Sequence, residues 1–156
     1  VLQAIAQFCK NNNGKFINFK GKANSFAALQ LNLNKVFHLN GQQAMYIALG
    51  DEEPSQQLIQ KAEAAPFKII QASYQSALSA QADVVLPVTT WLEQDGHYIT
   101  GDGKIQKANH SLQPSIDIRS NQETLEMLAA ALHIEVNQDW LDSMLKTPAT
   151  IEIQSV

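Results

Sequence analysis

The chain has 156 residues, of which 45% are hydrophobic, enough for one compact domain, and its net charge of -4 argues against a nucleic-acid-binding surface. Its single cysteine, Cys9, excludes an internal disulfide and cannot by itself hold an iron–sulphur cluster or a structural zinc ion. No apolar run approaches the roughly 20 residues of a membrane helix and no signal peptide opens the chain, so we expect a soluble protein in a reducing compartment, without membrane insertion.

The first 31 residues predict two short helices with a strand between them. Apolar residues at helical spacing predict a helix over Leu2–Lys10, and Cys9 lies on its apolar stripe, which favours a buried hydrophobe over a nucleophile. Alternation predicts a strand over Lys15–Phe19, and a helical turn follows over Phe26–Leu31. Because Val1 falls at the start of the first helix, we expect the single domain 1–156 to be a fragment of a larger polypeptide.

Three apolar runs, Met45–Gly50, Phe67–Ile70 and Val84–Leu86, are typical of buried strands. Between the first two, Ser55 can cap a helix that extends to about Ala64, and a short connection or helix precedes the third. Strands separated by helix-sized segments indicate βαβ units. We therefore predict the α/β class, as a Rossmann-like three-layer α/β/α domain with a mainly parallel sheet. The third run lacks alternation, so it predicts a strand covered on both faces.

The carboxyl end of the third strand is where α/β sheets usually keep their sites. Pro87 ends that strand, because proline cannot donate to a sheet ladder, and a polar stretch follows. The acidic run 51–53 ends the first strand and could bind a metal or a cofactor hydroxyl, although attraction of carboxylates to a helix N-terminus is the favoured interpretation. Glu93, Asp95 and Asp102 could form an acid/base set, but nothing in the sequence shows that they converge.

No catalytic or metal-binding residue is predicted. The four histidines have no metal-ligand spacing, and each is interpreted as structural or solvated: His38, His97, His110 and His133.

The segment after the polar stretch predicts a hairpin. Tyr98–Thr100 and Lys104–Gln106 flank Gly101-Asp102-Gly103, in which an Asp-Gly pair supplies the positive φ angles of a tight turn. Local pattern alone favours a core strand followed by a surface ribbon without chemistry.

The carboxyl-terminal part begins with a polar loop over residues 107–119. Ser120–Glu123 then has capping-box spacing, and an apolar face follows for a helix. That face consists of Leu125, Met127, Leu128, Ala131 and Leu132. A small helix is predicted over Trp140–Leu145, and Thr150–Gln154 is either a terminal strand or an ordered piece of a boundary.

Four motifs together resemble the molybdopterin oxidoreductase superfamily over residues 21–132. They are Gly50-Asp51-Glu52-Glu53-Pro54, Ala82-Asp83-Val84-Val85-Leu86-Pro87, Glu93-Gln94-Asp95-Gly96-His97-Tyr98 and Gly103-Lys104-Ile105-Gln106. Within the superfamily, Ala23-Asn24-Ser25 is similar to the large iron–sulphur subunit of respiratory complex I, the NADH:quinone oxidoreductase, although Ala27 stands where that subunit has glycine. Formate dehydrogenases share the motifs between Ala82 and Gln106 and are the competing assignment.

The departures from the family pattern concern four positions where the family has lysine, threonine, asparagine and arginine. They are Gln94, His97, Thr100 and Lys104. Lysine cannot bind phosphate bidentately as arginine does, so the last change weakens a pterin-phosphate clamp. This fits a subunit that keeps the fold and has lost the cofactor.

The complex I resemblance implies a parent that passes electrons from NADH to quinone and carries 4Fe-4S and 2Fe-2S clusters. It implies a cofactor-free scaffold for this fragment, with other domains of the parent and neighbouring complex I subunits as partners. The parent would be cytoplasmic and peripheral on the inner side of the membrane. Five residues would then hold the loops rather than do chemistry: Asp83, Pro87, Glu93, Gly96 and Gly103.

The formate dehydrogenase-like alternative implies a molybdopterin guanine dinucleotide contacted by six residues. They are Gly50, Glu53, Thr89, Glu93, Gly96 and Lys104. A free-standing nucleotide-binding module is a third possibility.

Overall fold

The structure is a computed structural model that describes residues 2–12, 23–33, 35, 37–38, 41–100 and 103–136. The chain divides into two compact units, one formed by residues 1–35, 97–106 and 139–156, the other by residues 36–96 and 107–138. The strand predicted at 15–19, the residue Asp102 and the elements predicted at 140–145 and 150–154 lie outside the described residues. Within the described part, every helix is too short or too polar to cross a membrane.

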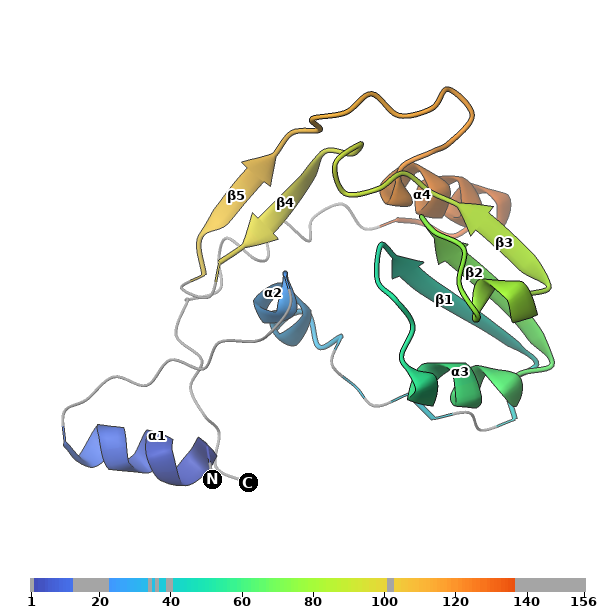
Figure 1. Cartoon of the computed structure of the whole chain (residues 1–156). Coiled ribbons are helices and arrows are strands. Elements are labelled where there is room, and N and C mark those ends of the chain that lie inside the picture. The colour runs from blue at the N-terminus through green and yellow to red at the C-terminus, as the bar shows by residue number, and fades with distance from the viewer. Residues whose placement is uncertain are drawn as a thin grey trace. The chain divides into compact units, whose positions relative to one another are not determined.

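The larger unit is built on a three-stranded parallel sheet, as predicted. Its strands are β1 (Ala44–Gly50), β2 (Phe67–Ala72) and β3 (Val84–Pro87), and they lie in that order (Figure 1). Ile70 in the central strand pairs with Ile47 on one side and with Val85 on the other. The sheet therefore follows the chain order, with β2 in the middle.

Helix α3 (Gln56–Glu63) covers one face of this sheet. The hydroxyl of Ser55 accepts a hydrogen bond from the backbone nitrogen of Leu58 at 3.2 Å, which confirms the predicted N-cap. Ile59 and Ala62 of the helix are buried in one cluster with apolar residues of the strands and with Leu78. Leu78 precedes a short 3-10 turn, η1 (Ser79–Gln81), which occupies the connection between β2 and β3.

Helix α4 (Asn121–Ala131) lies on the opposite face, anchored there by its first turn and without a fully buried side chain, so the larger unit has three layers. Side chains alternate along a strand, and Gln71 lies between Ile70 and Ala72, which pack on the α3 side. Gln71 contacts Asn121 in the first turn of α4. The predicted capping box is present, because Ser120 and Glu123 each bind the other's backbone nitrogen.

Two burial predictions were wrong. Val84 and Val85 are 38% and 46% exposed, because β3 is an edge strand rather than a strand in the middle of the sheet. The apolar face predicted for α4 is not buried either, since Leu125 and Met127 are 45% and 53% exposed. Both differences leave apolar surface uncovered in the larger unit.

The smaller unit contains α1 (Leu2–Asn11), α2 (Ser25–Gln30) and most of a hairpin of β4 (Gly96–Ile99) and β5 (Ile105–Ala108). The hairpin confirms the sequence prediction, and Gly103 in its turn has a φ of 83°. The Asn24 side chain joins α2 to β4, because it donates to the His97 carbonyl and accepts from the Ile99 backbone nitrogen. Cys9 is half-buried rather than fully buried.

Candidate functional site

The carboxyl ends of the three parallel strands form the candidate site of the larger unit. Asp51 and Ser73 follow β1 and β2 directly, and Thr89 lies two residues beyond β3. The backbone nitrogen of Ser73 donates to the Gly50 carbonyl at 3.0 Å, and its hydroxyl donates to the Thr89 carbonyl at 3.0 Å. Ser73 therefore bridges the loops that leave the two outer strands.

The stretch from Thr89 to Asp95, which we call the shelf, is held by carboxylates that accept backbone hydrogen bonds. Asp51 Oδ2 accepts from the backbone nitrogen of Trp91 at 2.6 Å. Glu93 Oε2 accepts from the backbone nitrogen and the hydroxyl of Thr90, at 2.9 and 2.8 Å. These two bonds, the backbone bond first, hold the pKa of Glu93 below its ordinary value, because they favour the charged carboxylate.

A polar network beneath the shelf ties it to the sheet and to α4. The Tyr46 hydroxyl donates to Gln71 Oε1, and Gln71 Nε2 donates to Asn121 Oδ1 at 2.5 Å. Asn121 in turn donates to Gln94 Oε1 from its backbone and side-chain nitrogens, both at 3.2 Å. Gln94 Nε2 reaches the Thr89 carbonyl at 3.4 Å. Burial raises the pKa of the Tyr46 phenol, because the charged form loses its hydration.

Sequence reasoning missed this network. The one available signal was Gln71 itself, a polar residue that directly follows the apolar run of β2 and is fully buried in the structure. A buried amide needs partners, but the sequence does not say that they come from Asn121, fifty positions away.

Two buried polar atoms at this edge of the sheet have no hydrogen-bond partner among the described residues. They are Asp51 Oδ1 and the hydroxyl oxygen of Thr89, a residue that is 2% exposed. Such atoms carry a desolvation cost, so each calls for an explanation.

The structure brings together some of the residues that the sequence singled out. Gly50, Thr89 and Glu93 all lie at the carboxyl edge, and Glu53 is an exposed residue of the loop after β1. Gly96 opens β4. Lys104 belongs to the smaller unit, where its backbone closes the hairpin turn with Thr100.

The acid/base set considered from the sequence, Glu93, Asp95 and Asp102, stays a prediction, because Asp102 lies outside the described residues. Asp95 Oδ1 contacts the backbone nitrogen and the ring Nδ1 of His110, both at 2.8 Å. These hydrogen bonds lower the pKa of Asp95, the backbone bond first. Among the residues that the structure describes, no three His, Cys, Asp or Glu side chains come close enough to hold a metal ion.

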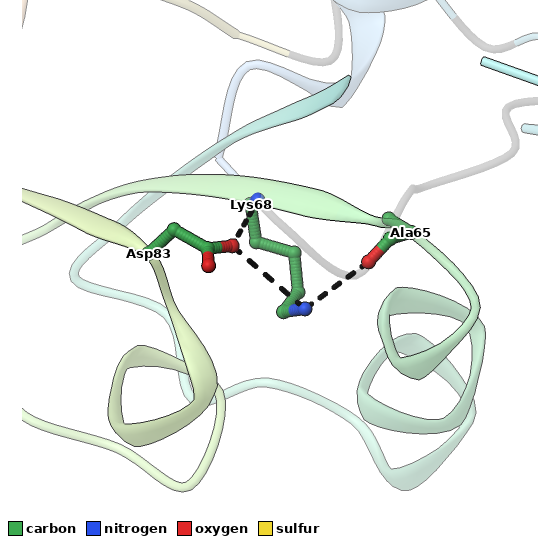
Figure 2. A network of polar contacts seen from close by, with 3 residues as sticks. All are labelled: Ala65, Lys68 and Asp83. Carbon is green, nitrogen blue, oxygen red and sulfur yellow. Dashed lines mark hydrogen bonds and ion pairs between the residues drawn. The ribbon is translucent and has the colours of Figure 1, made fainter. Parts of the chain in front are cut away.

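Asp83, part of the motif that precedes β3, lies at the amino end of the sheet and not at the candidate site. Figure 2 shows its carboxylate between the backbone nitrogen of Lys68, at 2.7 Å, and the Lys68 ammonium, at 3.9 Å. The same ammonium donates to the Ala65 carbonyl at 3.1 Å, and the backbone nitrogen of Asp83 donates to the Lys68 carbonyl at 3.0 Å. Asp83 therefore fixes the register in which β3 joins β2.

Comparison with known proteins relates the sequence of this chain to one family. The family model described as molybdopterin oxidoreductase matches residues 1–131. An NADH-quinone oxidoreductase subunit from Rickettsia felis is 27% identical over 122 residues, which are 78% of this chain and 17% of that protein. The corresponding protein from Rickettsia conorii is 31% identical over 78 residues, or 50% of this chain and 12% of that protein.

A putative formate dehydrogenase of Staphylococcus haemolyticus is 31% identical over 71 residues, which are 46% of this chain and 7% of that protein. The chain thus spans less than a fifth of the length of these curated relatives. Because the family model covers most of the chain, from the first helix through α4, the chain belongs to the molybdopterin oxidoreductase family.

Proposed function

We propose that this chain is a cofactor-free scaffold domain of a complex I large subunit, in keeping with its relatives among the NADH-quinone oxidoreductase subunits. In this proposal the parent passes electrons from NADH to quinone through its own iron–sulphur clusters, and the present domain supports neighbouring domains and subunits. It would lie at the inner, cytoplasmic side of the membrane only through that parent.

The observation that carries the proposal is that the polar side chains of the shelf bind the protein itself. Asp51 Oδ2 and Glu93 Oε2 accept hydrogen bonds from shelf backbone, and the Gln94 amide is shared between Asn121 and Thr89. Side chains held in this way position a loop, and their bonded atoms are not free to recognise a ligand. The same holds for Asp83, which clamps β3 to β2.

The uncovered edge of the sheet is a second, independent observation that supports a scaffolding role. The backbone nitrogen of Val88 donates to the Ala72 carbonyl, so by alternation the backbone groups of Val85 and Pro87 point away from β2, toward the open edge, where Pro87 offers no donor. Within the described residues, only the bridge between Val88 and Arg119 lies along that edge. An apolar strand with an open edge is a surface on which another polypeptide can add a strand.

The alternative, contact with a molybdopterin guanine dinucleotide, is favoured by the unpaired oxygens of Asp51 and Thr89. Both can accept from the amino groups of a pterin or a guanine. The diphosphate of such a cofactor does not fit, however, because the segments at this edge carry five acidic residues: Asp51, Glu52, Glu53, Glu93 and Asp95. These acidic residues outnumber the positive charge of Arg119, whose carbonyl accepts from the Thr89 backbone nitrogen, so the net charge of this edge is unfavourable for a diphosphate, the part of the cofactor that needs cations.

The two functions separate when Thr89→Val and Val85→Asp are introduced individually into the full-length gene and the parent assembly is purified. A scaffold predicts that Val85→Asp lowers the amount of assembled complex, whereas the quinone-reduction rate per assembled complex stays unchanged. Thr89→Val removes the unpaired hydroxyl and should leave both quantities unchanged.

A cofactor role predicts the opposite pattern for Thr89→Val, with normal assembly and a lower content of molybdenum or tungsten and of pterin. Metal analysis and pterin fluorescence of the wild-type parent provide the reference. Stoichiometric molybdenum or tungsten with pterin in the parent, lost in Thr89→Val, would contradict the scaffold.

A further inference from the structure

The shelf ends in the pair Asp95-Gly96, which has an intrinsic chemical weakness. The backbone nitrogen that follows an aspartate can attack the side-chain carboxyl carbon, and glycine, which has no Cβ, hinders this attack least. The attack forms a C–N bond and releases water from the carboxyl group, which leaves a succinimide ring. Hydrolysis of the ring takes up water again and yields either aspartate or its isomer, isoaspartate.

The surroundings of this pair leave room for both steps. The Asp95 side chain is 53% exposed, so water reaches it. Gly96 is half-buried, but a Cβ atom added there meets nothing within 4 Å, so no neighbour encloses the attacking amide. Neither burial of the carboxyl nor packing against the glycine therefore prevents the reaction.

The carboxylate is restrained instead by the loop over residues 110–112. Asp95 Oδ1 lies 2.8 Å from the backbone nitrogen of His110 and 2.8 Å from its ring Nδ1. The Leu92 carbonyl accepts from the next two backbone nitrogens, of Ser111 at 2.7 Å and of Leu112 at 3.0 Å, so the loop is fastened to both ends of this part of the shelf. The bonds from His110, the backbone bond first, lower the pKa of Asp95 and so disfavour the carboxylic acid, the form that loses water most readily.

We propose that the bond between Asp95 and Gly96 is a site of spontaneous isomerisation to isoaspartate, and that the contacts with His110 keep this reaction slow in the folded protein. Isomerisation routes the main chain through the side-chain carbon, which lengthens the backbone where the shelf passes into β4. It also moves the free carboxylate, so the contact with His110 is lost. The reaction needs only water, and it does not depend on the proposed function.

The test is to age the purified full-length parent at neutral pH, in native buffer and in urea, and to measure isoaspartate by peptide mapping. Cleavage after Tyr98 separates Asp95 from Asp102, which belongs to the second Asp-Gly pair of the sequence. Isomerisation leaves the mass unchanged, which distinguishes it from deamidation at asparagine. In the wild type, isoaspartate at Asp95 should form more slowly in native buffer than in urea.

Two substitutions remove the restraint in steps. His110→Ala loses the ring contact and keeps the backbone donor, and it should raise the native rate at Asp95 by about threefold or more, because a hydrogen bond to a charged group is lost. His110→Pro loses both donors and should raise the rate further. Circular dichroism verifies the fold, and the comparison with His110→Ala decides if His110→Pro does not fold.

The matched control is Gly96→Ala, which hinders the attack without creating a clash. It should suppress isoaspartate at Asp95 in the wild type and in both His110 variants, whereas the rate at Asp102 should be the same in all these proteins. Equal rates at Asp95 in native buffer and in urea, or a native rate that neither substitution of His110 raises, would overturn the proposal.

Discussion

Gln71 Nε2 and Asn121 Oδ1 lie 2.5 Å apart, and this contact joins the central strand of the sheet to the first turn of α4. Gln71 is fully buried, and its other end accepts from the Tyr46 hydroxyl. The amide therefore connects β1, β2 and α4 through one side chain.

We expect Gln71→Leu to lower the free energy of unfolding by about 2 kcal/mol or more, because it leaves Tyr46 and Asn121 without their partner. Urea denaturation measures the change. Gln75→Leu, at an exposed position in the following loop, is the control and should change stability little. Tyr46→Phe should cost about 1 kcal/mol in the wild type and almost nothing in the Gln71→Leu background, since the hydrogen bond is then already lost. If the losses of stability from Tyr46→Phe and Gln71→Leu simply add in the double variant, the two side chains are not coupled and the network is contradicted.

Asp83 should act through its hydrogen bond to backbone more than through its charge. The ion pair with the Lys68 ammonium is long, at 3.9 Å, and its carboxylate is 41% exposed, so it contributes little, whereas the bond to the Lys68 backbone nitrogen satisfies a donor at the start of β2. Asp83→Asn keeps an acceptor and should be nearly neutral, and Asp83→Ala should destabilise by about 1 kcal/mol. Thermal denaturation in low and high salt provides the measurement. If Asp83→Asn and Asp83→Ala lose the same amount of stability in low salt, and neither loses any in high salt, the charge of Asp83 dominates instead.

Gly50 and Gly96 offer a matched test of backbone strain. A Cβ atom added at either position meets nothing within 4 Å, but only Gly50, with a φ of 59°, has the left-handed conformation that side chains disfavour. Gly50→Ala should therefore destabilise the fold by about 1 kcal/mol, and Gly96→Ala should be neutral or slightly stabilising. The measurement is the midpoint of urea denaturation of each variant. Equal midpoints for Gly50→Ala and Gly96→Ala would contradict the role of the positive φ.

Acid should destabilise the larger unit through three carboxyls whose pKa values are lowered by hydrogen bonds: Glu93, Asp95 and Glu123. A carboxyl with a lower pKa in the folded state contributes stability above its ordinary pKa, 4.5 for glutamate and 3.8 for aspartate, and that contribution is lost as the pH falls through the lowered value. The free energy of unfolding should thus decline below about pH 4.5.

Glu93→Gln should make that decline shallower, because the variant side chain has no proton to gain at this position. Glu135→Gln, at an exposed position without a recorded hydrogen bond among the described residues, should leave the slope unchanged. Urea denaturation at a series of pH values gives the free energy of unfolding as a function of pH. Equal slopes for the wild type, Glu93→Gln and Glu135→Gln would contradict a contribution of Glu93 to the acid sensitivity.

Most of the elements could be predicted from the sequence because their signals are local. Ser55 and Ser120 cap their helices as expected, and the apolar runs before Gly50 and Pro87 are strands. Burial could not be predicted in the same way. Val84 and Val85 have the composition of a strand covered on both sides, but whether β3 is central or at the edge depends on what lies beside it, which its own residues do not encode.

The candidate site shows the same division. The sequence predicts a site at the carboxyl ends of the strands, and the parallel sheet brings those ends together at one edge. The hydrogen-bond partners of Asp51 and Gln94 could not be predicted, because they depend on tertiary packing. Asp51 accepts from Trp91, forty positions further along the chain, and Gln94 accepts from Asn121. Residues that resemble ligand contacts in sequence, Glu93 above all, bind their own loop in the structure.

The order of strands in the sheet has a consequence for synthesis on the ribosome. Because β1, β2 and β3 lie side by side in the order in which they are made, each strand can pair with its predecessor as it emerges. The amide of Gln71 must stay hydrated during this time, since Asn121 is made fifty residues later. We expect the nascent sheet to remain loosely packed on that face until α4 arrives, and the arrival of this helix to be the step that completes the domain.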